Sequence, residues 1–266
     1  AEALSGILGQ DVVVVNITGG SGAVGMNEGL RAKSDGYTIT MVSRGVISLP
    51  MMDMAPFQPH DFKFIANINT DPSVVVVSNK SKYETMDDLL ADLKANPGKL
   101  TYASSALPDF PALQFAQAAG VEFAMVPLAG AAPAIVEILG GRADFGAYGP
   151  GEVKAHVESG DLRPLALMAE SRLEWIPDVP TMRELGIDVV SETWRGIAVP
   201  SDTPDEIVRV LEDAIEKAVQ DPKFVEFMNT QSLIIDYKNK AEFEQKINDD
   251  IKFLEPVIEI AKQQSN

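Results

Sequence analysis

The segment Asn16 to Gly25, N-I-T-G-G-S-G-A-V-G, is the stretch of this sequence on which the fold is decided. Gly20 to Gly25 matches the G-x-G-x-x-G pattern of dinucleotide-binding loops, and the apolar run Val12 to Val15 precedes it. A dinucleotide fold also needs an acidic residue roughly 20 residues further on, at the end of the next strand. Ser43 and Arg44 stand there instead. Arginine would suit a 2′-phosphate, so an NADP site is weakened but stays open.

The glycines of this segment form the first candidate ligand contact. Four of the residues from Gly19 to Gly25 are glycine, so the backbone can approach a ligand closely. A helix that starts after them would direct free N–H groups at an anion. Gly19, Gly20 and Ser21 are therefore predicted to touch the ligand, and the alternative is a flexible surface turn.

Outward from this segment, short apolar runs alternate with longer amphipathic segments, which is typical of an α/β protein. The predicted strands cover residues 12–15, 37–43, 64–67, 73–78, 100–104, 144–148, 165–168 and 196–199. The predicted helices cover residues 1–8, 26–32, 86–94, 111–119, 133–139, 205–220 and 241–262. Gly9 would end the first helix, and Pro256 would bend or break the last.

The chain shows no internal repeat and no long linker, so two lobes would have to be joined through extended segments. Asp71 to Ser78 and Thr193 to Pro200 are the candidate connections, and two such crossings make a hinge. The predicted lobes are residues 1–77 together with 195–266, and residues 78–194. Because residue 1 falls inside a predicted helix, we expect lobe one to lack a part upstream of it.

Composition excludes several function classes. The formal net charge is −17 and no Lys/Arg cluster relieves it, so nucleic acid is an unfavourable partner. With no cysteine and two distant histidines, His60 and His156, the chain supplies no thiolate nucleophile and little for a zinc site. No apolar run approaches the roughly 20 residues that span a bilayer. We expect a soluble protein with no catalytic group, metal or cofactor.

A second loop follows a predicted strand and leads into a predicted helix. Ser104 and Ser105 lie at its start, where small polar residues ahead of a helix N-terminus can hold a carboxylate or phosphate. The alternative is that both serines only cap the helix. Neither serine is an activated nucleophile, because the G-x-S-x-G elbow is absent and no base stands nearby.

A third loop, Pro127 to Pro133, consists of small residues with a proline near the start of the next helix. This pattern leaves backbone donors free for a ligand, although a tight packing turn is the competing interpretation. The predicted contacts here are Ala129, Gly130 and Ala131. Among aromatic residues, Tyr148 and Trp194 are favoured over Phe110 to border the ligand, although aromatic side chains are more often part of a core.

Taken together, five segments resemble the periplasmic substrate-binding proteins of tripartite tricarboxylate transporters, the Bug family. Each motif is weak alone, but five in the family's order cover nearly the whole chain. They are N-I-T-G-G-S-G-A-V-G at 16–25, S-D-G-Y-T at 34–38, N-P-G-K-L-T-Y-A-S-S at 96–105, G-A-A-P-A-I-V-E-I-L-G-G-R-A-D at 130–144 and I-P-D-V-P-T-M-R-E-L-G at 176–186.

The resemblance implies a two-lobed, type II Venus-flytrap fold with two crossover strands. It also implies that a small carboxylate or amino acid is trapped between the lobes and delivered to the permease subunits of a transporter. The protein would then be periplasmic or tethered to the outer face of the cytoplasmic membrane. Two alternatives stay open: an NADP-dependent oxidoreductase that uses Gly20 to Gly25, and a ligand-sensing module for a membrane receptor.

The chain departs from the family pattern at three places. The family begins with a strand and a glycine loop ahead of the first helix, and neither is seen here. Asp109 would lie near the ligand and repel a carboxylate, unless the ligand carries an amine or Asp109 faces away or caps the helix. Ser43 and Arg44 follow a predicted strand where the family often has small polar residues. Arg44 could hold a carboxylate with two hydrogen bonds, and exposure to solvent is the alternative.

Overall fold

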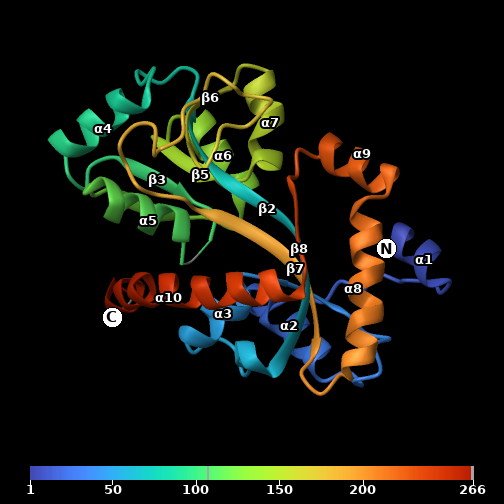
Figure 1. Ribbon diagram of the computed structural model, residues 1–266. Coiled ribbons are helices and arrows are strands. Elements are labelled where there is room, and N and C mark those ends of the chain that lie inside the picture. Colours follow the sequence, from blue (N-terminus) through green and yellow to red (C-terminus); the bar gives the residue numbers. More distant parts are fainter. Residues whose placement is uncertain (107, 265–266) are drawn as a thin grey trace. The chain divides into compact units, whose positions relative to one another are not determined.

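The computed structural model describes residues 1–106 and 108–264 (Figure 1). The chain divides into two compact units, Ala1–Thr70 with Trp194–Asn266 (unit 1) and Asp71–Thr193 (unit 2). Both boundaries fall inside long strands, β2 (Phe62–Ser78) and β7 (Glu192–Pro200). The chain therefore passes from one unit to the other twice, each time in extended backbone. No helix in the described ranges has the length and apolar character needed to cross a bilayer.

Unit 1 combines helices with short antiparallel strands. β1 pairs antiparallel with β7, with Thr40 opposite Ala198, and β8 pairs antiparallel with β2. The amphipathic helix α8 buries Val208 and Ile215 against Ile65 of β2. Its other elements are α1 (Glu2–Leu8), α2 (Ala23–Leu30), β1 (Thr40–Ser43), α3 (Gly45–Met51), α8 (Asp205–Val219), α9 (Pro222–Thr230), β8 (Ile235–Lys238) and α10 (Lys240–Gln264), with 3-10 turns at Gly20–Gly22 and Pro59–Asp61.

Unit 2 contains parallel strands with helices between them. β3 pairs in parallel with β4 and with β5, and β2 runs antiparallel to β5 and β6. The rings of Tyr102, Phe115, Phe123 and Phe145 form its aromatic core, with centroids 5.2 to 6.1 Å apart. Its elements are α4 (Met86–Ala95), β3 (Thr101–Ser104), α5 (Phe110–Ala119), β4 (Ala124–Pro127), α6 (Ala131–Leu139), β5 (Phe145–Tyr148), α7 (Pro150–Glu158) and β6 (Leu162–Met168).

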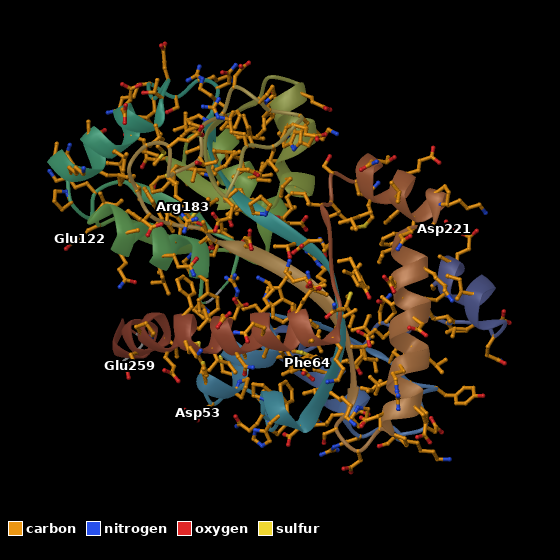
Figure 2. The ribbon with its side chains drawn as sticks, viewed as in Figure 1. Asp53, Phe64, Glu122, Arg183, Asp221 and Glu259 are labelled. Atoms are coloured by element: carbon orange, nitrogen blue, oxygen red, sulfur yellow. The ribbon has the colours of Figure 1, made fainter. Side chains whose placement is uncertain are left out.

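Side chains separate by polarity within each unit. In unit 1, Phe64 packs edge-on against Phe243 with ring centroids 5.4 Å apart, whereas Asp53 is exposed (Figure 2). In unit 2, helix α4 starts at a capping box in which Thr85 and Asp88 exchange hydrogen bonds through their side chains and backbone N–H groups. Local capping and burial thus place each helix against its own unit.

Several secondary-structure predictions are wrong. Residues 12–15 were predicted as a strand, but residues 11–19 have no regular secondary structure. The two strands predicted at 64–67 and 73–78 are one strand, β2. Helix α10 continues through Pro256 without a break. Pro256 is exposed, so water can satisfy the carbonyl that the proline leaves unpaired. Five elements were not predicted: α3, β4, α7, α9 and β8.

Candidate ligand-binding site

In unit 2, three loops leave the carboxyl ends of parallel strands and enter helix N-termini. Ser104, the last residue of β3, lies opposite Pro127, the last residue of β4, and Tyr148 ends β5 on the other side of β3. The carboxyl edge of such strands is where α/β sheets bind ligands. Helices α5, α6 and α7 start from this edge, so their first N–H groups gather there.

Asp109 caps the first of these helices from inside the protein. Its side chain is 2% exposed. One carboxylate oxygen accepts the N–H of Ala112 at 3.1 Å, and the other accepts the N–H of Ser105 at 3.2 Å. The hydroxyls of Tyr102 and Ser104 complete its surroundings at 3.2 and 3.0 Å. Asp109 is therefore the N-cap of α5, one of the two alternatives to a ligand contact.

Burial has an electrostatic consequence at Asp109. Removal from water raises the pKa of Asp109 above its usual range, and this outweighs the hydrogen bonds that favour the carboxylate. Ser104 Oγ lies 2.7 Å from the carbonyl of Ala106 and 3.0 Å from Asp109 Oδ2. One hydroxyl hydrogen cannot serve two acceptors, so a protonated Asp109 that donates to Ser104 fits this arrangement.

Helix α6 differs from its two neighbours at its N-terminus. α5 is capped by Asp109, and at α7 the Glu152 carboxylate accepts the N–H of Gly149 at 2.8 Å. At α6 the N-cap is Gly130, with φ of 106° and no side-chain cap. Ala129 is exposed, and Gly130 and Ala131 are half-buried. The N–H groups at this end thus lie at the strand edge without a capping side chain, as free donors for an anion.

The two aromatic residues predicted to border the ligand lie in the cores of their units. Tyr148 is buried and its hydroxyl donates to the carbonyl of Ala103 at 2.7 Å. Burial also raises the pKa of Tyr148. Trp194 is fully buried in unit 1, where its ring meets Phe243 edge-on and its Nε1 donates to Asp250. Both polar atoms are already paired inside the protein. Phe110 is half-buried at the start of α5.

The glycine loop of unit 1 is exposed and tightly wound. Gly19, Gly20, Ser21 and Gly22 all have positive φ, which is uncommon for the serine. A Cβ atom at Gly19 would come 2.9 Å from Val24, so both conformation and space require glycine there. The loop ends at the N-terminus of α2, which has no side-chain cap.

Ser43 and Arg44 stand at the junction of β1 and α3. The Ser43 hydroxyl accepts the N–H of Gly45 at 3.4 Å, and both residues are half-buried. Arg44 is the N-cap of α3, with φ of −49°. The predicted residues thus form two groups, each within one unit: Gly19 to Ser21 with Ser43 and Arg44, and the three loops of unit 2.

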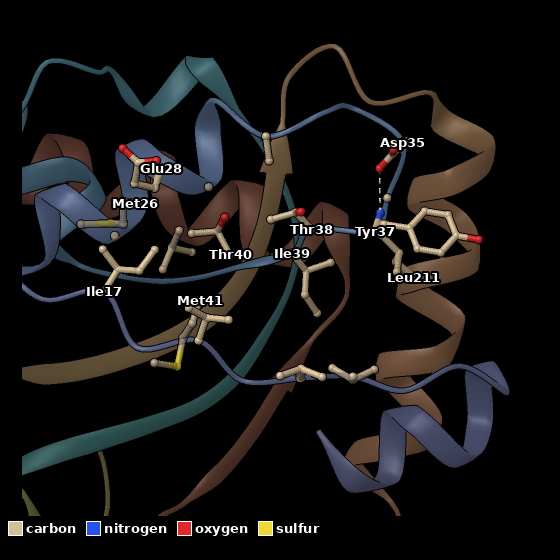
Figure 3. A pocket seen from close by; sticks show the side chains of 18 of the residues that line it. Ile17, Met26, Glu28, Asp35, Tyr37, Thr38, Ile39, Thr40, Met41 and Leu211 are labelled. Atoms are coloured by element: carbon tan, nitrogen blue, oxygen red, sulfur yellow. Dashed lines mark hydrogen bonds between the residues drawn. The ribbon is translucent and has the colours of Figure 1, made fainter.

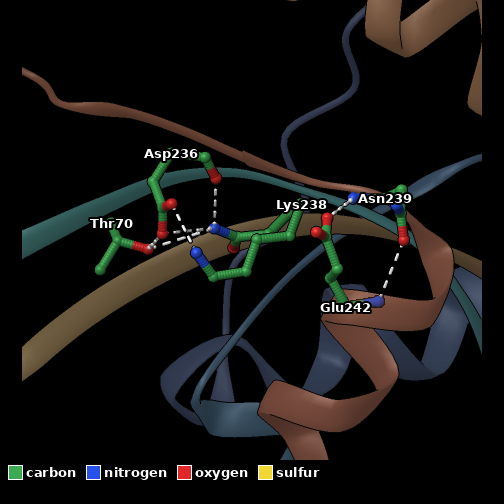
Figure 4. A network of polar contacts seen from close by, with 6 residues as sticks. Thr70, Asp236, Lys238, Asn239 and Glu242 are labelled. Atoms are coloured by element: carbon green, nitrogen blue, oxygen red, sulfur yellow. Dashed lines mark hydrogen bonds and ion pairs between the residues drawn. The ribbon is translucent and has the colours of Figure 1, made fainter.

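One polar network was missed because strand β8 was not predicted. Asp236 accepts hydrogen bonds from Asn67 at 2.7 Å, through its carbonyl, and from Thr70 at 2.6 Å, through its carboxylate, and pairs with Lys238 (Figure 4). Thr70 is the last residue of β2 in unit 1. The network holds β2 in place where the strand leaves this unit. Buried asparagine and threonine within an apolar strand were the sequence signal.

The described residues contain no cluster of three or more His, Cys, Asp or Glu side chains that could hold a metal ion. Comparisons with known proteins agree with a binding role for the fold. A family model described as "Tripartite tricarboxylate transporter family receptor" matches residues 1–262. Protein BugT of Bordetella pertussis is 32% identical over 87% of this chain and 73% of its own length.

Solved structures give the same result. A TctC solute-binding protein from Polaromonas, solved without ligand, aligns with a TM-score of 0.84 and 31% identity, over 97% of this chain and 90% of its own. A protein of R. palustris with adipate is 24% identical, with a TM-score of 0.86 and coverage of 98% and 90%. MatC of Rhodopseudomonas palustris, with bound malate, is 19% identical, with a TM-score of 0.81 and coverage of 96% and 90%. The predicted fold class, an α/β protein of the two-lobed periplasmic-binding type, is confirmed.

Proposed function

Because this chain belongs to the tripartite tricarboxylate transporter receptor family, we propose that it captures a small carboxylate-containing solute outside the cytoplasm. It then delivers this solute to the permease subunits of a tripartite tricarboxylate-type transporter. The solute is not changed chemically. The family is one of solute-binding receptors, which supports binding over catalysis and leaves the oxidoreductase alternative without a relative.

The observation that carries this proposal is the uncapped N-terminus of α6 at the strand edge of unit 2. The first N–H groups of α6, from Ala131 and Ala132, have no capping side chain, whereas the neighbouring helices use Asp109 and Glu152. A carboxylate placed there would receive backbone hydrogen bonds and the favourable end of the helix dipole. The hydroxyl of Ser105, on the adjacent loop, is a further donor.

The choice of a carboxylate has two supports. Backbone donors and a hydroxyl select an anion without any acid or base, which suits binding followed by release. The fold is also compatible with dicarboxylates, since two more distant structures of this fold contain adipate and malate. We therefore expect a ligand with at least one carboxylate. Gly19 to Ser21 and Arg44 are proposed as contacts from unit 1.

A thermal-shift screen tests the function. The panel is malate, adipate, citrate, benzoate, glutamate and NADPH, because a ligand at 100 times its Kd adds about 2.7 kcal/mol of stability. A concentration-dependent shift with a carboxylate, and none with NADPH, is the expected result. A shift with NADPH alone would sink the proposal, as would none with any carboxylate.

The variant Ala131→Pro tests the seat itself. Proline fits the first turn of a helix but has no N–H group, so it removes one donor while α6 still forms. We expect affinity for the carboxylate found in the screen to fall about tenfold, the equivalent of one hydrogen bond to a charged group. The matched control is Ala241→Pro, an exposed alanine in the first turn of α10. Equal affinity in both variants would remove α6 from the site.

A further inference from the structure

A groove of about 1150 Å³ runs through unit 1 between residues 10–18 and strand β1 (Figure 3). Apolar side chains dominate its walls, among them Val13, Val15, Ile17, Ile39 and Met41. Several are strongly exposed: Val15 is 73% exposed and Met41 is 67% exposed. None of these residues belongs to the proposed ligand contacts. The groove therefore requires a separate explanation.

The two long edges of the groove consist of backbone that lacks a partner on that side. β1 is the end strand of the described sheet order and pairs with β7 alone. Residues 11–19 run without regular secondary structure, although Val12 to Val15 is a strongly strand-forming sequence. A β-strand needs a hydrogen-bonded neighbour on at least one side. Both edges are thus equipped to pair, and the groove separates them.

Helices close the groove on its two faces. Helix α2 reaches both edges: a Cβ atom at Gly25 would lie 2.9 Å from the carbonyl oxygen of Ile17, and one at Gly29 would overlap Thr40 of β1. On the other face α8 contributes Ile207, Val210 and Leu211. A space between two helical layers, bounded by two strand-like edges, is where a doubly wound sheet carries another strand, roughly 4.8 Å from each neighbour.

Chain order indicates which strand fits. Helix α1 leads into residues 11–19, and α2 leads from there to β1, so α1 and α2 act as crossover helices. Such crossovers connect parallel strands and are right-handed. In a 2-1-3 sheet order, the strand ahead of the first helix lies between the two that follow it. The groove occupies that middle position.

We propose that the groove is the seat of one more parallel β-strand, apolar on both faces, which the same polypeptide supplies from residues directly preceding α1. This strand pairs with β1 on one side and with residues 12–17 on the other. It covers Val15 and Met41 and makes the valine run a true strand. The solved relative from Polaromonas has the length for it, since this chain covers 90% of that protein. The inference does not depend on the proposed function.

Single-cysteine labelling tests the strand, because the natural chain contains no cysteine. Val15→Cys and Met41→Cys are placed both in the 266-residue chain and in a form extended by the residues that its gene encodes upstream. A maleimide reagent should label both positions about tenfold more slowly in the extended form, because the strand buries them. The control is Val136→Cys in unit 2, which is 55% exposed and should react at one rate in both forms.

A second variant keeps the test decisive. Two prolines at alternate positions of the upstream apolar run prevent strand pairing, so they should restore fast labelling at Val15→Cys and Met41→Cys. Equal labelling rates in the short and extended forms would overturn the proposal. A gene with no apolar run ahead of Ala1 would do the same. Slow labelling that survives the prolines would point to some other cover over the groove and also overturn it.

Discussion

The two units treat their valine-rich segments in opposite ways. In unit 2, Val74 to Val77 of β2 are buried and pair with β5 on one side and with β6 on the other. In unit 1, Val13, Val14 and Val15 have the same strand-forming character but are exposed and lie outside every strand. The comparison teaches that strand propensity is realised only where neighbours supply hydrogen bonds and a covered face.

The strongest way to sharpen this comparison is to delete a side chain on each side of it. Phe145 is fully buried and contacts three other aromatic rings in unit 2. Phe145→Ala should lower the free energy of unfolding by about 3 to 5 kcal/mol. Val15→Ala removes an exposed side chain and should change it by less than about 0.5 kcal/mol. Urea unfolding of the 266-residue chain measures both. Equal losses would mean that the valine segment is already packed.

Much of the fold could be predicted from the sequence, because loops carry recognisable residues. Gly9 ends α1 in the left-handed conformation, as expected, and the start of α4 was placed correctly. Helix α3 could not be found, because it begins with Gly45 and contains Pro50, and both residues argue against a helix. The strand at 12–15 was predicted from propensity alone, which does not report whether a partner is present.

Two glycine substitutions test the packing that surrounds the groove. A Cβ atom at Gly29 would overlap Thr40, so Gly29→Ala must push α2 away from β1 and should cost about 1 to 3 kcal/mol. Gly6 lies inside α1 with no atom within 4 Å of its Cβ position. Gly6→Ala should instead stabilise the protein by about 0.5 to 1 kcal/mol, since alanine favours a helix. Thermal unfolding compares the two, and a neutral Gly29→Ala would show that α2 is loosely packed.

The candidate site could be predicted only in part. Small residues between a strand and a helix pointed to the loops at Ser104 and Gly130, because that pattern leaves backbone donors at a sheet edge. Side-chain direction was beyond the sequence: Tyr148 ends a strand, yet its hydroxyl bonds inward to Ala103. The network at Asp236 was also missed, because it joins residues that lie 166 positions apart or more. Such contacts depend on tertiary packing rather than on local pattern.

A smaller and pH-dependent effect separates the buried carboxylates of the two units. In unit 2, burial raises the pKa of Asp109, so its stabilising contribution is present at low pH and is lost as pH rises through the folded-state pKa. In unit 1, burial alone would raise the pKa of Asp236, but hydrogen bonds from Lys238 and Thr70 outweigh it and lower the pKa. The contribution of Asp236 is therefore present at neutral pH and is lost as pH falls through that lowered value.

The asparagine variants of these two residues should consequently show opposite slopes. Relative to the natural chain, Asp109→Asn should gain stability as pH rises above about 4, whereas Asp236→Asn should gain it as pH falls below about 4. Neither slope can exceed about 1.4 kcal/mol per pH unit, because each variant removes one proton-binding group. Urea unfolding from pH 3 to pH 8 measures both, and each variant serves as the other's control. Slopes of the same sign would mean that one carboxylate has the wrong surroundings. A flat line for Asp109→Asn would show that its hydrogen bonds to Ser105 and Ala112 balance the cost of burial, and the carboxylate would then be ionised at the edge where the ligand is proposed to bind.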